Sequence, residues 1–378
     1  EEGLRVPLAD LPTQYQRLKA DIDAALLSVL ESGHFLDGEP VRQLEHEIAT
    51  LCGAAQGIAV ASGTDALLLA LKAAGIEEGQ EVITSPFTFA ATAEAIALLG
   101  ARPVFVDIDP CTFLLDEAQI EAARTPRTKA LLPVDLFGQM VDRQALEALA
   151  SKHGLAVIYD GAQAIGARQQ GGPLAAWGEA VTLSFYPTKN LGAYGDGGMV
   201  LTNSWELAAQ VKSLRSHGVG AGGRYGYHER VGYCSRLDSL QAAVLLVKLS
   251  HLAAWTQRRR EHAARYQALL SPLSKQGLVL PGCGVGNYHV YHQYTVRHPQ
   301  RERLQAYLLE QGIESKVFYP LPLHLQAAFR SLGYREGDFP QAEQAAKEVL
   351  SLPIHPELTS GQVEYVAEQI HRFFEQAG

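Results

Sequence analysis

The chain has 378 residues, of which 47% are hydrophobic and 19% are charged, and its formal net charge is −9. This length predicts two domains, or one large α/β domain with a smaller appendage, and the apolar share argues against wholesale disorder. The negative charge argues against a general nucleic-acid binder, which would carry a basic face, but leaves room for a local basic pocket.

The cysteines predict a reducing compartment. They are scattered, with neither a CxxC pair nor a Cys/His metal spacing, at Cys52, Cys111, Cys234 and Cys283. No metal site is therefore expected. The opening residues EEGLRVPLAD lack a basic segment followed by an apolar run, and no stretch of about 18 uncharged apolar residues occurs. We expect a cytoplasmic protein without a signal peptide or a membrane span.

The first half of the chain predicts helices and then a mainly parallel sheet. Helices are expected over roughly 21–31 and 39–52, the second with Val41, Leu44, Ile48 and Leu51 on one face. Short apolar runs then alternate with helical segments, which indicates βαβ units, and the runs are apolar throughout, as in strands covered on both faces. Seven strands are expected, at 57–62, 81–86, 102–109, 129–138, 155–162, 180–186 and 197–203.

The second half predicts a smaller α+β domain. A long helical stretch from about residue 240 to 270 leaves the sheet domain. The elements expected after it are a strand over 288–297, a helix over 301–312, a strand over 315–320 and two or three helices ending near Phe374. We therefore divide the chain into a large domain, residues 1–250, and a small C-terminal domain, residues 251–378.

Ligands of open parallel sheets bind beyond the carboxyl ends of the strands. The turn Ser62-Gly63-Thr64 lies between a strand and a helix, which suits either an anion site or simple helix capping. Phe87 and Phe89 end the next strand, as core aromatics or, for Phe89, as a flat face for a ring.

Two further strand ends carry Asp160 and Lys189. Asp160 follows an apolar run, with Gln163 three residues later, and is either a helix cap or a carboxylate held for a cationic partner. Lys189 lies in SFYPTKNLGAYGDGG, near Ser184 and Thr188. A lysine in a dry pocket has a lowered pKa, and a neutral amine forms a Schiff base with an aldehyde. These residues together suit pyridoxal 5′-phosphate, which needs such a lysine, an anionic partner, an anion cup and a stacking aromatic.

The chain resembles the DegT/StrS-type nucleotide-sugar aminotransferases, which have the aspartate-aminotransferase fold. The resemblance covers nearly the whole length and rests on ASGTDALLLAL, TFAAT, DGAQAIGA, SFYPTKNLGAYGDGG, RLDSLQAA, FYPLPLHLQ and SLPIHPELT. It implies a pyridoxal-phosphate-dependent transferase of fold type I, with a seven-stranded sheet domain and a homodimer whose sites lie at the subunit interface.

The resemblance also implies roles for single residues. Lys189 matches the Schiff-base lysine, Asp160 the partner of the ring nitrogen, and Gln163 the residue beside the ring hydroxyl. The other matched residues are Phe89 for stacking, Gly63, Thr64 and Ser184 for the phosphate, Arg236 for a contact in the neighbouring subunit's site, and Tyr186, Tyr319 and His324 for the substrate. His217, His228, His289 and His292 are further possible sugar contacts, with ordinary surface or core roles as the alternative.

The expected reaction moves an amino group from L-glutamate to a keto nucleotide-linked sugar, for amino-sugar, surface polysaccharide or glycoside biosynthesis. The likeness is greatest to 3-keto-sugar enzymes such as the UDP-2-acetamido-2-deoxy-3-oxo-glucuronate aminotransferases. A 4-keto-sugar aminotransferase and a pyridoxal-phosphate-dependent sugar dehydratase are the alternatives, and a regulatory protein is the non-enzymatic one.

Two positions depart from the family pattern. Cys234 stands where the family usually has an Asn that reaches the phosphate across the dimer, and a thiol is a weak donor. We expect weaker cofactor retention or a substitute donor such as Ser235. Phe318 stands where related 3-amino-sugar enzymes often have His, which removes a polar contact to the sugar.

Overall fold

The computed structural model describes residues 4–220, 223 and 226–377. Residues 1–3, the beginning of the stretch EEGLRVPLAD, lie outside this range. Two N-terminal helices are present, α1 (Leu11–Ser32) and α2 (Glu39–Cys52). α1 begins well before the expected start near residue 21, because the Asp10 side chain accepts a hydrogen bond from the backbone N–H of Thr13 and a proline occupies the first turn.

The seven-stranded sheet is confirmed. Its strands are β1 (Gln56–Val60), β2 (Glu81–Thr84), β3 (Arg102–Phe105), β4 (Thr128–Leu132), β5 (Ala156–Asp160), β8 (Ala180–Ser184) and β9 (Gly198–Thr202). They lie in the order β1-β9-β8-β5-β4-β2-β3. Only β9 runs antiparallel to its neighbours, so the sheet is mainly parallel, as predicted.

Both faces of the sheet are covered, which explains the unbroken apolar runs. Ile58 and Val60 of β1 are buried in one hydrophobic cluster and Ala59 between them in another, because successive side chains point to opposite faces. The helices between the strands are α3 (Gly63–Ala73), α4 (Ala91–Leu98), α5 (Ile120–Ala123) and α6 (Arg143–His153), and α7 (Trp205–Arg215) follows β9.

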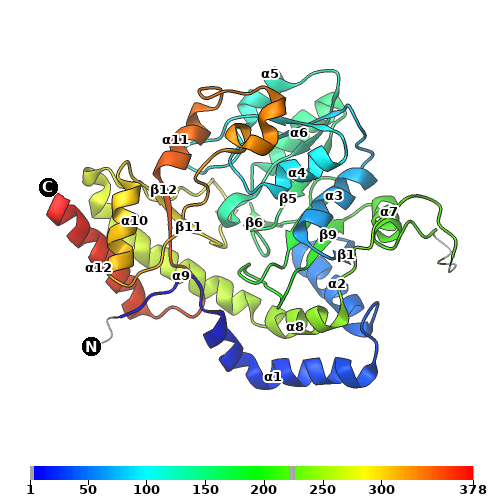
Figure 1. The fold of residues 1–378 in the computed structure, drawn as a ribbon, viewed down its shortest axis with the longest axis horizontal. Coiled ribbons are helices and arrows are strands. Elements are labelled where there is room, and N and C mark those ends of the chain that lie inside the picture. Colours follow the sequence, from blue (N-terminus) through cyan, green and yellow to red (C-terminus); the bar gives the residue numbers. More distant parts are fainter. Residues whose placement is uncertain (1–3, 221–222, 224–225, 378) are drawn as a thin grey trace.

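The long helical stretch after the sheet is two helices, α8 (Ser239–Leu249) and α9 (Leu252–Leu270). At the break, the hydroxyl of Ser250 donates to the carbonyl oxygen of Val247, a local bond that competes with the regular helix. Figure 1 shows α1 lying alongside α8 at the lower edge of the molecule.

The C-terminal region contains a two-stranded ribbon and three helices. These elements are β11 (Tyr294–Arg297), paired antiparallel with β12 (Val349–Leu352), and α10 (Arg301–Glu310), α11 (Pro340–Glu348) and α12 (Ser360–Ala377). The strand expected over 315–320 was wrong, since that segment makes only the single bridge Lys316–Ser351. Pro320 within it has no N–H to donate to a ladder.

The strand expected over 288–297 is divided between two sheets. Only β11 joins β12, whereas β10 (Asn287–Tyr288) pairs with β6 (Arg168–Gln169), which pairs in turn with β7 (Gly172–Pro173). Short 3-10 turns complete the described chain, η1 (Glu117–Gln119), η2 (Leu136–Gly138), η3 (Ser271–Gln276), η4 (Leu323–Leu325) and η5 (Ala327–Leu332).

The elements β11, β12, α10 and α12 lie together on one side of the large sheet, at the left in Figure 1. Their core includes Val6, which forms a bridge with Ile313, so the N-terminal segment packs there too. Phe329 and Phe339 instead pack into the core of the large sheet. The boundary near residue 250 remains a proposal. Within the described residues, no helix is long and apolar enough to span a membrane.

Candidate active site

Asp160 is the last residue of β5 and is buried, with 4% of its surface exposed. Its Oδ2 accepts a hydrogen bond from Thr92 Oγ1 at 2.8 Å, and its Oδ1 accepts from the Ala162 N–H at 3.1 Å. Burial raises the pKa of Asp160, while these two bonds and the nearby Lys189 act in the opposite direction. Thr92, at the start of α4, was not predicted as a site residue, although it belongs to the TFAAT stretch.

Gln163 is held from two directions. Its Oε1 accepts from the Phe137 N–H at 2.7 Å, and its Nε2 donates to the Tyr319 hydroxyl at 3.1 Å. Phe137 lies in the turn after β4 and has a φ of 60°, and its backbone N–H points at the Gln163 side-chain amide. The ring of Tyr319 packs edge-on against Phe87 at 6.0 Å between centroids. Segments far apart in the sequence therefore meet at Gln163.

Lys189 lies in the tight loop between β8 and β9 and is half-buried. The backbone N–H of Lys189 donates to the Tyr186 carbonyl at 2.8 Å. A Cβ at Gly192 would lie 2.2 Å from the carbonyl oxygen of Pro187, so this loop closes only around a glycine. Burial lowers the pKa of Lys189 to about 8, against the opposing effect of Asp160. The loop thus holds a lysine that is partly neutral near neutral pH.

Residues on the far side of the loop are structural. Asn190 is buried and donates to the carbonyl of Val290, and its Oδ1 lies 3.1 Å from His292 Nδ1. Burial, together with Lys189 and Arg259, holds the pKa of His292 well below its usual range. Burial also lowers the pKa of His289 to about 3. Burial therefore favours the neutral form of both imidazoles, and His289 stacks on Tyr291.

The turn Ser62-Gly63-Thr64 meets the end of β8. Ser62 caps α3, because its Oγ accepts from the Asp65 N–H at 3.1 Å. A Cβ at Gly63 would lie 2.6 Å from Ser184 Cβ, so the turn and Ser184 are in direct contact only because the residue is a glycine. Thr64 and Ser184 are half-buried beside it. This arrangement places two hydroxyls at a helix N-terminus, which suits an anion.

Next to this turn lies the segment with the unusual cysteine. Cys234 is exposed, and its Sγ lies 3.5 Å from Arg236 Nη2. Ser235 is fully buried, donates to Asp65 Oδ2 at 2.6 Å and accepts from the Ala61 N–H at 3.2 Å. The expectation that Ser235 substitutes as a phosphate donor is not supported, because its one proton is already used. Arg236 Nε is buried without a partner in the part of the chain that the structure describes.

The remaining predicted residues differ in accessibility. Phe89 and Tyr186 are 59% and 54% exposed, so each offers a free ring face. His324 is only 2% exposed, its Nε2 lies 2.8 Å from Glu343 Oε1, and its ring packs on Phe339. Nothing in this placement supports a sugar contact by His324. His217 and His228 contact each other, His228 Nδ1 lying 2.8 Å from the His217 carbonyl.

The assembled groups fit pyridoxal 5′-phosphate. They comprise a lysine of lowered pKa, a buried carboxylate whose charge acts on that lysine, an exposed aromatic ring, and hydroxyls at the start of α3. A cavity of about 520 Å³ elsewhere, between α2, β6 and the α8–α9 junction, contains none of these residues.

Comparison with known proteins agrees with this site. A model described as the DegT/DnrJ/EryC1/StrS aminotransferase family matches residues 16–371. A pleiotropic regulatory protein of Geobacillus stearothermophilus is 53% identical over 98% of this chain and 99% of its own. The UDP-2-acetamido-2-deoxy-3-oxo-D-glucuronate aminotransferase of Pseudomonas aeruginosa is 44% identical over 96% and 98%. The crystal structure of S. venezuelae DesV has a TM-score of 0.95, with 42% identity over 98% of this chain and 99% of that one.

Proposed function

Because the chain belongs to the DegT/DnrJ/EryC1/StrS aminotransferase family, we propose that it transfers the amino group of L-glutamate to the 3-keto carbon of a nucleotide-linked sugar. Aminotransferases of this family use pyridoxal 5′-phosphate. The name of the Pseudomonas relative supports C3 and a UDP-linked substrate. The observation that carries the proposal is the convergence of a lysine in a tight glycine-dependent loop after β8 and a buried carboxylate at the end of the neighbouring strand β5, close enough for each charge to act on the other's pKa.

The cofactor, when bound, supplies an aldehyde that takes up an amino group and a ring that accepts electron density. Lys189 Nζ would be the amine that holds this aldehyde. The lowered pKa of Lys189 keeps part of the amine neutral, so Nζ could accept a proton from Cα of the donor and give a proton to the sugar carbon. The Asp160 carboxylate would keep the ring nitrogen protonated, and Gln163 would bind the ring hydroxyl.

The phosphate and the ring are held by the residues around them. Gly63, Thr64 and Ser184 would bind the phosphate at the start of α3, and Phe89 would cover one ring face. Arg236 and Cys234 lie next to that turn, and we propose that they contribute to the site of the neighbouring subunit. Tyr186 and Tyr319 face the substrate.

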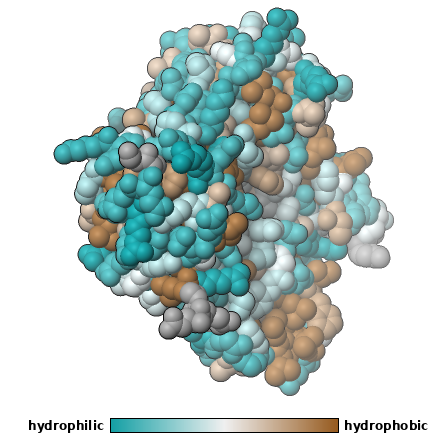
Figure 2. Space-filling model, turned by 60° about the vertical axis from the view of Figure 1, so that its left-hand side comes forward, coloured by the Kyte–Doolittle hydropathy of each residue, from teal (hydrophilic) through white to brown (hydrophobic). Residues whose placement is uncertain are grey.

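A homodimer is part of the proposal. Figure 2 shows hydrophobic side chains gathered at the lower edge of the molecule, where α1 lies in Figure 1. The exposed apolar residues of α1 and the following segment include Leu27, Leu30, Phe35 and Leu36. Contiguous apolar surface of this kind is typical of a protein–protein interface.

The test is a panel of keto nucleotide sugars supplied with glutamate and followed by mass spectrometry. It includes 3-keto and 4-keto sugars, linked to UDP and to dTDP. We expect an amino product from a 3-keto sugar, formed only with glutamate, and none from the Lys189→Ala variant. Turnover of 4-keto sugars alone would move the reaction to C4. Loss of water from the sugar without an amino donor would instead identify a dehydratase.

The Geobacillus relative is named a pleiotropic regulatory protein, so a second test separates an aminotransferase from a regulator. Adding glutamate to the purified protein should replace the visible Schiff-base absorbance with the near-ultraviolet band of pyridoxamine phosphate. A colourless protein that binds DNA would contradict the proposal, and the net charge of −9 argues against that outcome.

A further inference from the structure

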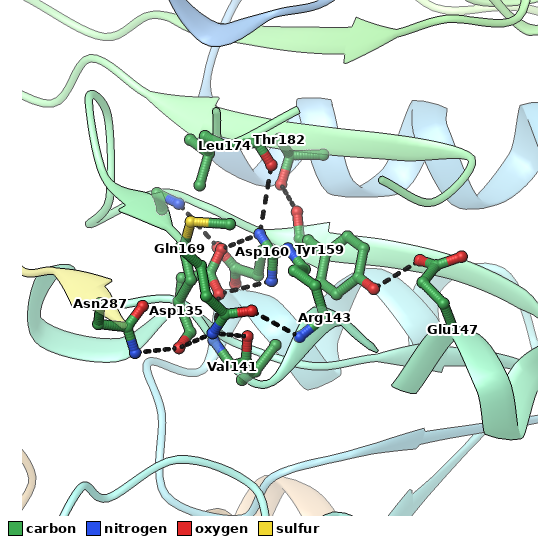
Figure 3. Close-up of polar contacts among 12 residues, drawn as sticks. Asp135, Val141, Arg143, Glu147, Tyr159, Asp160, Gln169, Leu174, Thr182 and Asn287 are labelled. Atoms are coloured by element: carbon green, nitrogen blue, oxygen red, sulfur yellow. Dashed lines mark hydrogen bonds and ion pairs between the residues drawn. The ribbon is translucent and has the colours of Figure 1, made fainter. Parts of the chain in front are cut away.

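A buried ion pair behind Asp160 has no part in the proposed chemistry. Asp135 Oδ1 accepts from Arg143 Nη1 at 2.8 Å and its Oδ2 accepts from Nη2 at 2.7 Å, and both side chains are 0% exposed. Figure 3 shows this pair grouped with Tyr159 beside Asp160. A buried ion pair is often no more stabilising than apolar residues of the same volume, so stability alone does not explain it.

The pair is connected directly to the end of β5. The Asp135 N–H donates to the Asp160 carbonyl at 2.9 Å, and the Asp160 N–H donates to the Pro133 carbonyl at 2.9 Å. The guanidinium of Arg143 lies 3.5 Å from the ring centroid of Tyr159, the residue before Asp160. Movement of Asp135 or Arg143 is therefore transmitted to the backbone that carries Asp160.

The same pair shapes the turn that orients Gln163. Asp135 Oδ1 also accepts from the Val141 N–H at 2.9 Å, which closes the segment between them. That segment contains Phe137, whose N–H binds the Gln163 side chain. Asp160 and Gln163, the two residues proposed to bind the cofactor ring, are therefore both held by the turn 133–138.

Three ionisable groups interact electrostatically with Asp160, namely Lys189, Tyr319 and Asp135. Burial keeps the Tyr319 phenol neutral by raising its pKa, and Lys189 favours an ionised Asp160. Of the three, Asp135 opposes the ionisation of Asp160, because a nearby like charge favours the protonated form of the Asp160 carboxyl. Held by two short bonds to Arg143, Asp135 presents a small dipole to Asp160 in place of a net negative charge.

We propose that Arg143 is a positioning residue for Asp160: by neutralising Asp135 and fixing the 133–138 turn, it keeps Asp160 ionised and in place against the cofactor ring nitrogen. This inference rests on the proposed function, because it takes Asp160 as the partner of that nitrogen. If the pair only stabilised the fold, loss of Arg143 and loss of Asp135 should reduce cofactor affinity by similar amounts. The proposed role predicts unequal effects, because only the loss of Arg143 exposes the negative charge of Asp135.

The experiment measures the dissociation constant of pyridoxal 5′-phosphate for the unliganded protein across a range of pH. Three variants are compared with wild type, Arg143→Met, Asp135→Asn and the double variant. We expect Arg143→Met to bind about tenfold more weakly, the equivalent of about one pKa unit, with a deficit that grows as the pH falls. Asp135→Asn and the double variant should stay near the wild-type affinity, because neither has an unpaired carboxylate at position 135 and the Asn side-chain oxygen can still accept the turn-closing bond from the Val141 N–H.

A matched control separates charge from folding. Arg297→Met breaks another largely buried ion pair, with Glu348 at 2.8 Å, and should lower the Tm without changing cofactor affinity. Equal losses of affinity in Arg143→Met and Asp135→Asn would overturn the inference. If Arg143→Met does not fold, a tenfold loss in Asp135→Asn would overturn it on its own. A wild-type protein that fails to bind pyridoxal 5′-phosphate would instead refute the proposed function.

Discussion

The hydrogen bond from Thr92 to Asp160 offers a direct test of how the site is built. In Thr92→Val the side chain keeps its shape but loses the hydroxyl that donates to Asp160 Oδ2 at 2.8 Å. A hydrogen bond to a buried charged group contributes roughly 1.5–3 kcal/mol. At about 1.4 kcal/mol per pKa unit, its loss should raise the pKa of Asp160 by roughly one to two units.

A higher pKa leaves less of Asp160 ionised to pair with a protonated ring nitrogen. Affinity for pyridoxal 5′-phosphate should therefore fall by roughly tenfold to a hundredfold, most strongly at the acidic end of the pH range. The assay is a titration of the unliganded protein with the cofactor at several pH values. Thr92→Ser, which keeps the hydroxyl, should restore most of the affinity.

The control is a second buried threonine, on a strand that does not pair with β5. The hydroxyl of Thr202 in β9 donates to the Glu179 carbonyl at 2.6 Å, so Thr202→Val should affect stability and leave cofactor affinity unchanged. If Thr92→Val binds the cofactor as wild type does at every pH, the ionisation of Asp160 does not depend on Thr92 and the reasoning fails.

Three further predictions concern other parts of the chain. Burial lowers the pKa of Lys189 from 10.5 to about 8, so the folded state binds fewer protons than the unfolded state between these values. The stability of the unliganded protein should therefore rise with pH across that window, and this rise should be smaller in Lys189→Ala by thermal denaturation; identical pH profiles would contradict it. Cys234→Asn adds a stronger donor beside the α3 turn and should tighten cofactor binding several-fold, whereas an unchanged dissociation constant would show that position 234 does not reach the phosphate. His324→Leu should lower stability by about 1–3 kcal/mol without changing the KM for the sugar, and a raised KM at unchanged Tm would restore a substrate role for His324.

Much of the sheet and of the site could be predicted because both depend on local patterns. Strands covered on both faces are apolar at every position, so seven short runs located the seven strands. Parallel strands bring their carboxyl ends to one edge, so the polar residues that follow them were expected to converge. Asp160, Ser184 and the Gly63 turn do lie at strand ends, and Gly63 contacts Ser184.

Where the structure departs from the sequence pattern, the deciding contact is not local. The segment 315–320 has the composition of a strand, but its Tyr319 side chain binds Gln163 and the ladder position beside β11 belongs to β12. His324 lies in a family-like stretch, yet Glu343 takes its imidazole into the core. Ser235 is an available donor in the sequence, and only its bond to Asp65 removes it as one.

The amino-acid sequence by itself determined the sheet, the lysine loop and the family resemblance, because periodicity, turn residues and strand ends are properties of neighbouring residues. Only the tertiary structure decided which side chains set the ionisation and position of the site residues. Thr92 reaches Asp160 across 68 residues, and Arg143 reaches it through Asp135 and Tyr159. The hydrogen bonds and charges that set a buried carboxylate's pKa come from whichever side chains packing brings within about 4 Å, and no spacing along the chain records that distance.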